Sequence, residues 1–250
     1  MESMESYRKF LKAERWDEWE ELETDQRKKN PPPPPQKPYS KGATLIELIN
    51  PKNLTIGNMP LIEAISFRKS RRKFTNESLT LEELSFLLWA TQGVRKISGG
   101  GTVTRRTVPS GGSRHPFETY LFINRVIGVE PGLYRYLPLD HKLCFLKADA
   151  DLEKKVSNAC RGQTFVGKGA VVFIWAVIPY RAEWRYSFVA HKMIAMEAGH
   201  ICQNLYLASE AIGAGTCAIG DYRNNEMDNI IGVDGRDEFV IYIAPVGKKK

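Results

Sequence analysis

Nine consecutive apolar residues, Ala170 to Ile178 (AVVFIWAVI), constrain the fold of this chain more than any other feature. The run is rich in β-branched and aromatic residues, which favours a strand over a helix. It is also too short to cross a membrane as a helix. We therefore expect a fully buried strand in the sheet of a globular domain.

The other apolar patterns mix helices and strands. Thr80 and Glu83 form a T-x-x-E capping box before a leucine-rich helix. One long helix is predicted from Tyr186 to Ile212, ended by Gly213 and Gly215. Because the helices and strands do not alternate regularly, the pattern predicts an α+β fold layered around a sheet. The further predicted segments are a short helix after Pro60, a loop from Ser98 to Ser113, strands at Glu118–Asn124, 133–136 and 143–146, a helix from Asn224 and a last strand from Glu238 to Val246.

The first 57 residues are predicted to form an arm, and residues 58–250 the compact domain. The start of the arm is charged and mildly amphipathic, which is compatible with a helix. Pro31 to Pro35, with Pro38 beyond them, predict a stiff polyproline II spacer. Such a spacer can bind a proline-recognition domain, but we expect an arm that lies along the body or along a second subunit. The anchor residues expected in residues 1–30 are Tyr7, Phe10, Leu11, Trp16 and Trp19.

Charge and cysteine usage limit the class of protein. The chain has 250 residues and carries 36 Lys and Arg against 29 Asp and Glu, a formal charge of +7 that favours an anionic partner without naming one. Its N-terminus lacks the apolar core of a signal peptide, so we expect a cytoplasmic protein that does not span a membrane. Cys144, Cys160, Cys202 and Cys217 are scattered without a C-x-x-C pair. They are expected to be reduced, mostly buried thiols rather than zinc ligands or a disulfide framework.

Three partial motifs do not fit their usual structural context. Residues 213–218 match the dinucleotide pattern G-x-G-x-x-A, but here the glycines close a helix instead of opening one. Residues 162–169 resemble a P-loop, yet Gly169 stands where a magnesium-binding Ser or Thr is required. Glu197 and His200 form a single E-x-x-H pair, whereas a di-iron bundle needs two such pairs and further carboxylates. We therefore expect no metal site and interpret His200 as a packing or hydrogen-bonding residue.

The stretch FRKSRRKF, Phe67 to Phe74, concentrates five cations around Ser70. Taken alone, it is compatible with a solvated basic turn after a helix. A nucleic-acid patch would interleave aromatic residues with the cations, and no ribonucleoprotein motif or zinc finger is present. We therefore do not expect nucleic acid to be the partner, although a basic nucleic-acid binder remains an alternative.

Four stretches in the same order resemble the FMN-dependent nitroreductase family. "SFRKSRRKF" is similar to its R-x-S-x-R signature, and "VPSGGSRHPFETYLF" to its P-S-x-G loop and following strand. "EAGHICQNLYLASEAIGAGTCAIGDY" resembles its long helix and flavin-facing segment, and "APVGKKK" the end of its last strand. The match runs from Pro60 to Lys250. The segment "DQRKKNPPPPPQKP" points to the SagB-type dehydrogenase branch, which includes oxidases of peptide thiazolines and oxazolines.

The resemblance implies a three-layer α/β/α sandwich with a central mixed sheet, in an intertwined homodimer that binds FMN. Arg68 would hold the phosphate, Ser70 would bond near the ribityl chain or ring, and Arg72 would lie beside N1 and the C2 carbonyl. A backbone N–H of the segment around Gly220 would bond flavin N5. The cofactor-binding set implied is Arg68, Lys69, Ser70, Arg72, Pro109, Ser110, Gly111, Gly112, Ser113, Ala218, Ile219, Gly220, Lys248 and Lys249, of which 109–113 would reach the flavin of the other subunit.

The catalytic set implied is Arg72, Gly220 and Tyr186. Azoline oxidases are proposed to use a Lys-Tyr pair, and Arg185-Tyr186 is the candidate here, although an arginine that stays protonated cannot act as a base. The side chains of Lys69, Arg71 and Lys73 can simply face water. The lysines at the end of the chain are expected either to contact the phosphate or to fray.

The implied function is hydride transfer from NADH, NADPH or the substrate itself to an organic acceptor, with a small molecule or a peptide as substrate. The alternative from another class is a flavin- or partner-binding module without turnover, recruited through the proline-rich arm.

Overall fold

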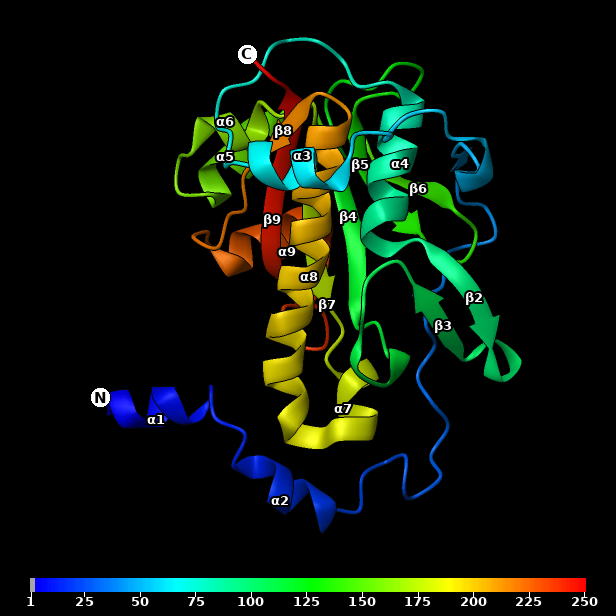
Figure 1. Cartoon of the computed structure of the whole chain (residues 1–250), viewed down its shortest axis with the longest axis vertical. Helices are drawn as coiled ribbons and strands as arrows, with labels where there is room; N and C mark the ends of the chain where they lie inside the picture. The colour runs from blue at the N-terminus through cyan, green and yellow to red at the C-terminus, as the bar shows by residue number, and fades with distance from the viewer. Residues whose placement is uncertain (1–2) are drawn as a thin grey trace.

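A seven-stranded sheet forms the centre of the computed structural model, which describes residues 3–250 (Figure 1). Its order is β1-β6-β5-β4-β7-β9-β8, and every pairing between these strands is antiparallel. The expected mixed character is therefore wrong for the strands themselves. Among the described residues, the parallel pairings are two isolated bridges, Ser70 with Thr216 beside β8 and Leu79 with Val126. The strands are β1 Leu45–Glu47, β4 Phe117–Ile123, β5 Gly132–Leu137, β6 Lys142–Lys147, β7 Val171–Val177, β8 Ala214–Thr216 and β9 Phe239–Lys248.

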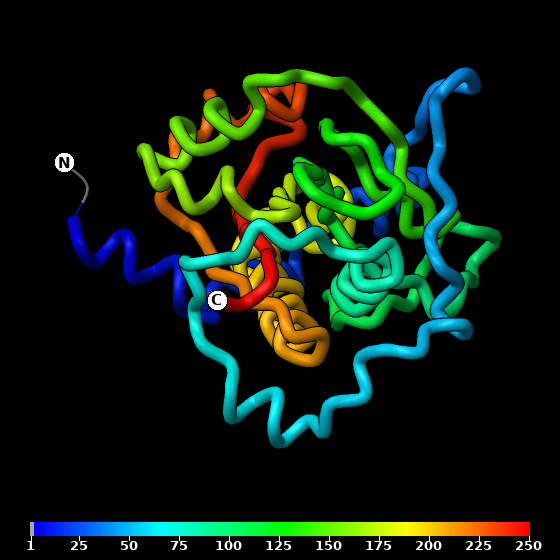
Figure 2. The backbone as a smooth tube through the Cα atoms, turned by 90° about the horizontal axis from the view of Figure 1, so that it is seen from above, coloured from blue at the N-terminus to red at the C-terminus, as the bar shows by residue number. Residues whose placement is uncertain are grey.

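Both faces of the sheet are covered, which confirms the three-layer architecture. All residues of β7 are buried, as the apolar run predicts. Alternate residues of β4 enter two different cores: Leu121 and Ile123 pack on the side of α4 and α8, whereas Tyr120 and Phe122 pack on the side of α5, α6 and α9. Seen from above, these two groups of helices lie on opposite sides of the strands (Figure 2). The helices are α3 Leu61–Phe67, α4 Leu81–Gln92, α5 Leu152–Ala159, α6 Thr164–Gly167, α7 Tyr180–Tyr186, α8 Ala190–Ala211 and α9 Asn224–Ile231.

The structure tests the predicted capping box and the predicted long helix. The capping box is confirmed, because the Thr80 hydroxyl accepts from the Glu83 N–H while the Glu83 carboxylate accepts from the Thr80 N–H. The long helix is confirmed as α8 over Ala190–Ala211, but its predicted start at Tyr186 is four residues too early, because the chain breaks at Ser187, which has a φ of 50°. A 3₁₀ turn there separates α7 from α8 and turns the chain sharply.

The expected loop from Ser98 to Ser113 is partly a hairpin. β2 (Val94–Ser98) pairs with β3 (Val103–Arg106) in a separate two-stranded sheet. Gly99, Gly100 and Gly101 form the turn with φ between 59° and 95°. The glycines thus serve a tight turn, and only the last part of the segment, Pro109 to Ser113, remains a loop.

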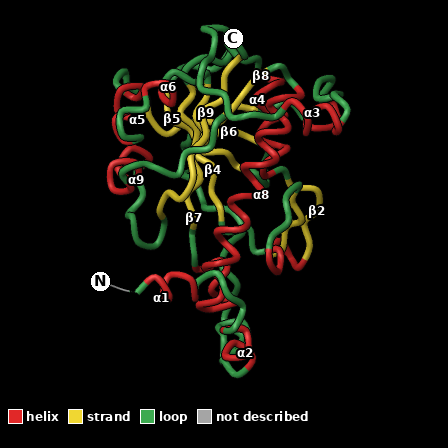
Figure 3. The backbone as a smooth tube through the Cα atoms, turned by 60° about the vertical axis from the view of Figure 1, so that its left-hand side comes forward, coloured by secondary structure: helices red, strands yellow, loops and turns green. Residues whose placement is uncertain are grey.

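The proline-rich arm lies along the body. Two short helices, α1 (Met4–Lys9) and α2 (Arg15–Glu20), precede it, and the chain then runs up one side of the domain (Figures 1 and 3). The buried arginines Arg106 and Arg135 donate to the carbonyls of Pro35 and Pro38, at 2.7 and 2.8 Å. The arm then supplies β1, the edge strand paired with β6.

Of the expected N-terminal anchors, only the tryptophans pack against the body. Trp16 and Trp19 each lie 6.0 Å from the Tyr186 ring, measured between ring centroids. Tyr7, Phe10 and Leu11 are exposed, so their expected role as anchors within one chain is wrong.

The structure also bears on the membrane and cysteine predictions. Within the described part of the chain, no helix combines the length and the apolar character that crossing a membrane requires. All four cysteines are buried free thiols, as expected.

Candidate functional site

The basic stretch is an extended loop that leaves α3 and runs beside the edge of the sheet. The Arg71 N–H donates to the Thr216 carbonyl at 2.9 Å, and Ser70 forms a bridge with the same residue of β8. This approach needs a glycine in β8, because a Cβ on Gly215 would lie 2.3 Å from Cδ of Arg71. The loop is thereby held at the end of the sheet where the chain terminates (Figure 1).

Tyr206 of α8 joins two of the predicted site segments. Its hydroxyl lies 2.9 Å from the Ser70 hydroxyl and accepts from the Ala218 N–H, also at 2.9 Å. The Arg68 guanidinium lies over the Tyr206 ring, 5.3 Å from its centroid. The R-x-S-x-R loop and the segment 218–220, separated by about 150 residues in the sequence, therefore meet at one side chain.

Glu210 of α8 holds the same loop from the other side. Its buried carboxylate accepts from Nε of Arg71 at 3.1 Å and also pairs with Lys249. Lys248 ends β9, pairs with Glu83 and donates to the Ile212 carbonyl at 3.3 Å. Arg71 therefore does not simply face water, and Lys248 and Lys249 are ordered rather than frayed.

The remaining cations of the basic loop have no carboxylate partner among the described residues. Within residues 3–250, no carboxylate forms an ion pair with Arg68, Lys69, Arg72 or Lys73, and the last two are exposed. Since unpaired guanidinium and ammonium groups favour an anion, this loop fits the phosphate of FMN. Lys248 and Lys249, in contrast, already have carboxylate partners.

The segment from Ala218 to Gly220 presents one open backbone position. Ile219 is buried and pairs with Ile243 of β9, with its N–H donating to the Ile243 carbonyl at 2.8 Å. Gly220 is exposed, and nothing lies within 4 Å of a Cβ built on it. Cys217 is buried, as expected of a packed thiol. Gly220, rather than Ile219, is thus the residue whose N–H can reach a ligand.

The P-S-x-G loop lies elsewhere, beside the N-terminal half of α8. The Gly111 N–H donates to the Glu197 carboxylate at 2.7 Å, and Gly112 has a φ of 55°. A Cβ on Gly112 would lie 2.8 Å from both Cδ of Arg185 and the Tyr186 hydroxyl, so the Arg185-Tyr186 pair contacts this loop. Pro109, Ser110 and Gly111 line a cavity of about 280 Å³ together with Met193, Met196, Glu197 and His200.

Glu197 is the titratable group of this cavity. Burial raises the pKa of its carboxyl to about 7, partly opposed by the hydrogen bond from Gly111. Glu197 therefore holds the loop. His200 is exposed and forms no hydrogen bond among the described residues, so its expected role as a packing or hydrogen-bonding residue is wrong. Among the residues that the structure describes, no three His, Cys, Asp or Glu side chains gather as metal ligands would.

The predicted site is thus divided within one chain. Arg68 to Arg72, Ala218 to Gly220 and Lys248 to Lys249 gather around the C-terminal half of α8. Pro109 to Ser113 and Tyr186 lie at its other end. Glu197 and Tyr206 mark the two positions, and at 1.5 Å per residue they are roughly 13 Å apart along the helix.

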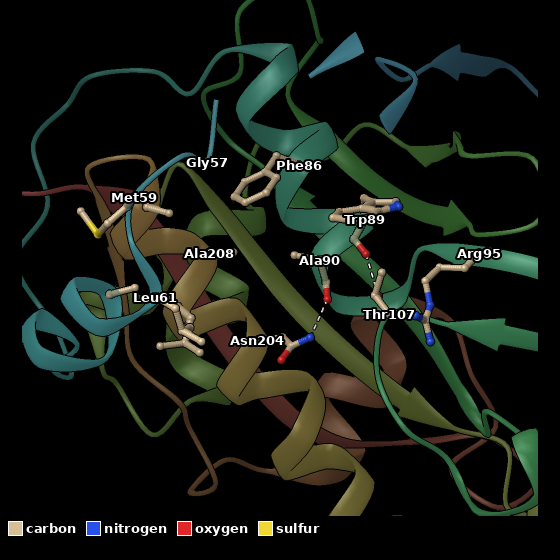
Figure 4. Close-up of a pocket in the computed structure, with 13 residues that line it drawn as sticks. Gly57, Met59, Leu61, Phe86, Trp89, Ala90, Arg95, Thr107, Asn204 and Ala208 are labelled. Carbon is tan, nitrogen blue, oxygen red and sulfur yellow. Dashed lines mark hydrogen bonds between the residues drawn. The ribbon is translucent and has the colours of Figure 1, made fainter. Parts of the chain in front are cut away.

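A larger apolar cavity opens between α3, α4 and the C-terminal half of α8 (Figure 4). Its volume is about 390 Å³, and Leu61, Phe86 and Trp89 form much of its wall. Asn204 uses one of its amide N–H groups within the fold, because it donates to the Ala90 carbonyl at 2.8 Å. The cavity therefore offers mainly apolar contacts.

Sequence reasoning missed Tyr206, Glu210 and the loop contact of Glu197. A usable signal existed, because Tyr206 and Glu210 are four residues apart and thus lie on one helix face. A tyrosine and a carboxylate in an otherwise apolar helix segment indicate polar partners, but their identity depends on the fold.

Comparisons with known proteins give a family match and several related proteins. Residues 65–248 match the model of the family described as "Nitroreductase family". The chain is 32% identical over 194 residues to the protein MJ1384 of Methanocaldococcus jannaschii, named as a nitroreductase, which covers 78% of this chain and 93% of that protein. It is 26% identical to the microcin B17-processing protein McbC of Escherichia coli over 53% of this chain and 50% of McbC.

Two solved structures show the same fold. One, from Ralstonia eutropha and named as a nitroreductase, has a TM-score of 0.68 at 27% identity, covering 88% of this chain and 94% of that one. The NADPH:FMN oxidoreductase of Vibrio harveyi, complexed with NAD+, has a TM-score of 0.53 at 16% identity, covering 76% of this chain and 69% of that one.

Proposed function

Since this chain belongs to the nitroreductase family, we propose that it is a flavin oxidoreductase that binds FMN at the basic loop and transfers hydride between a donor and an organic acceptor. The main support is the group of cations Arg68, Lys69 and Arg72, which form no ion pair among the described residues. Through Ser70 and the Ala218 N–H, Tyr206 joins the loop that carries them to the segment that ends in the exposed Gly220. Bound FMN supplies the hydride chemistry, while the chain binds it, orients it and adjusts its electronic properties.

Three residues of the basic loop have distinct roles in this proposal. Arg68 holds the phosphate, since a guanidinium binds phosphate in a bidentate manner. Ser70, positioned by Tyr206, bonds near the ribityl chain. Arg72 stabilises the negative charge that reduction places at the N1–C2 edge. The free N–H of Gly220 donates to N5.

A two-fold dimer completes the site. α8 exposes Ala195, Met196, Gly199, His200 and Gln203 along one face, and the small residues allow a second helix to approach closely. If two copies of α8 pack antiparallel, the P-S-x-G loop of one copy lies near the basic loop of the other. An isologous interface of this kind forms two equivalent sites.

We propose a nicotinamide as the electron donor. The similarity in fold to the NADPH:FMN oxidoreductase supports this assignment. The nicotinamide would bind and leave first, and the organic acceptor would then bind at the same position.

A second candidate is oxidation of a modified peptide, as in the SagB-type branch. The similarity to the microcin B17-processing protein McbC and the contact of Arg185 and Tyr186 with Gly112 support it. Here the peptide itself would be the hydride donor, and Tyr186 would act as the proton-handling group near the partner's flavin. A module recruited through the proline-rich arm is less well supported, because Arg106 and Arg135 already bind arm carbonyls.

Purified protein tests the proposal directly. We expect a yellow protein with flavin absorbance that bleaches under anaerobic conditions with NADH or NADPH. Bleaching only with a peptide substrate would favour the second candidate, and stable flavin binding without reduction by any donor would favour a non-catalytic module.

The Arg68→Ala variant tests the phosphate role. It should be largely colourless, since a charge-assisted hydrogen bond contributes roughly 1.5–3 kcal/mol. Lys73→Ala is the matched control, because it removes an exposed cation of the same loop to which we assign no flavin contact. A folded Arg68→Ala protein that retains full FMN through gel filtration would contradict the assigned role.

A further inference from the structure

α1 carries an apolar face that its own chain leaves uncovered. No residue of this helix is buried. Met4, Tyr7 and Leu11 recur at helical spacing through α1 and the following turn, and Tyr7 and Leu11 are 59% and 67% exposed. A short amphipathic helix is marginal in water unless its apolar face packs against a partner. The face therefore indicates a docking element.

α3 carries the other uncovered apolar face. Leu61, Ile62 and Ile65 are 64%, 75% and 56% exposed, and only Ala64 of this helix is buried. Leu61 also forms a wall of the 390 Å³ cavity between α3, α4 and α8 (Figure 4). An exposed apolar patch of this kind, formed by α3 and the cavity, indicates a binding site for another apolar surface.

α1 cannot cover α3 of its own chain. Lys192, near the start of α8, donates to the Leu11 carbonyl, and the Arg15 guanidinium lies 3.7 Å from the centroid of the Phe188 ring. These contacts tether α1 at the N-terminal end of α8, whereas α3 packs at the C-terminal end (Figures 1 and 3). α8 has 22 residues and is thus roughly 33 Å long, while the eight residues from Met4 to Leu11 span roughly 12 Å as a helix.

We propose that α1 of each subunit docks on the apolar patch of α3 and the adjacent cavity in the second subunit. This inference rests on the dimer of the proposed function, in which antiparallel packing of α8 brings the N-terminal end of one copy beside the C-terminal end of the other. The charges also agree, because Arg8 and Lys9 lie in the last turn of α1 and Glu63 lies in the first turn of α3. The reciprocal exchange covers both apolar faces in both subunits. It also places a segment of one chain against the helix that leads into the other chain's basic loop.

Cross-linking between two co-expressed chains tests the exchange. One chain, with its own affinity tag, carries Tyr7→Cys, and the other carries Ile62→Cys with a different tag. Because the four native cysteines are buried, a short bismaleimide reagent acts mainly on the introduced thiols. We expect a covalent product carrying both tags. Leu146→Cys replaces Ile62→Cys in the control, since Leu146 is an exposed apolar residue on β6, away from α8.

The outcomes separate this inference from the dimer itself. Light scattering first establishes whether the protein is a dimer. A dimer in which Tyr7→Cys links to Ile62→Cys no more than to Leu146→Cys would overturn the exchange and leave the proposed function standing. A monomer would overturn both.

A second variant pair avoids any dependence on cross-linker geometry. Tyr7→Ser combined with Leu11→Ser should raise the dissociation constant of the dimer by roughly 100-fold or more, because two apolar side chains in each of the two subunits lose their contacts. Glu5→Ser in the same helix should leave it unchanged. Equal dissociation constants for the double variant and the wild type would contradict the docking of α1.

Discussion

Replacing Tyr206 with phenylalanine tests whether one hydroxyl joins the two halves of the flavin-binding region. The hydroxyl contacts the Ser70 hydroxyl and the Ala218 N–H, each at 2.9 Å. Phenylalanine keeps the ring on which the Arg68 guanidinium lies. The substitution therefore removes two hydrogen bonds and little else.

The expected magnitude follows from where the two partners lie. Ser70 is exposed, so its hydroxyl can bond water at almost no cost. Ala218 is half-buried, and its N–H loses its acceptor. We expect the free energy of unfolding of the flavin-free protein to fall by roughly 1–2 kcal/mol. If half or more of that energy positions the segment before Gly220, the dissociation constant for FMN should rise roughly 3- to 10-fold.

Two measurements and one matched variant decide the question. Urea unfolding gives the stability, and quenching of FMN fluorescence gives the affinity. Tyr134→Phe is the control, because its hydroxyl donates to the Glu130 carbonyl at 2.7 Å at the start of β5, outside the predicted site. It should lose comparable stability without any change in FMN affinity. A Tyr206→Phe protein that binds FMN as tightly as the wild type would refute the reasoning.

Three further predictions concern single residues. Burial raises the pKa of Glu197 from its ordinary 4.5 to about 7, so its stabilising contribution is complete below the ordinary value and is lost as the pH rises through 7. Relative to Glu197→Gln, the wild type should lose about 3 kcal/mol of unfolding free energy between about pH 4 and pH 8, measured by urea unfolding, and parallel curves would contradict this. Arg72→Gln should leave the affinity for oxidised FMN nearly unchanged. It should lower the midpoint potential of the flavin by some tens of millivolts in a spectroelectrochemical titration, because it removes a hydrogen bond that strengthens on reduction. An unchanged potential would exclude Arg72 from the edge of the flavin ring. Gly215→Ala should displace Arg71 and with it the basic loop, so FMN affinity should fall while circular dichroism stays native, and undiminished affinity would show that the loop is not held there.

Much of the fold was predictable because local patterns and burial agree. The apolar run at Ala170 to Ile178 could only be a buried strand, and the Thr80–Glu83 box fixed the start of α4 through its own hydrogen bonds. The predicted start of the long helix lies too early in the chain, because the turn at Ser187 depends on a positive φ that the sequence does not indicate. The glycines after Ser98 were interpreted as a loop, but a glycine turn is equally compatible with a hairpin.

The site was predictable where residues adjacent in sequence act together, as in Arg68 to Arg72. It was not predictable where distant residues meet, because only the fold brings Tyr206 to Ser70 and Glu210 to both Arg71 and Lys249. The exposure of α3 was also missed. The sequence predicted a short helix after Pro60, but it did not indicate that the chain would bury only Ala64 of this helix.

The flavin content and mass of the purified protein, measured together, test the central claim most directly. Size-exclusion chromatography with light scattering gives the number of chains, and the flavin absorbance of the same peak gives the number of FMN molecules. We predict two chains with one FMN for each, because the basic loop of one subunit and the P-S-x-G loop of the other form each site. A monomer that retains FMN, or a folded dimer that binds none when FMN is supplied, would contradict the account.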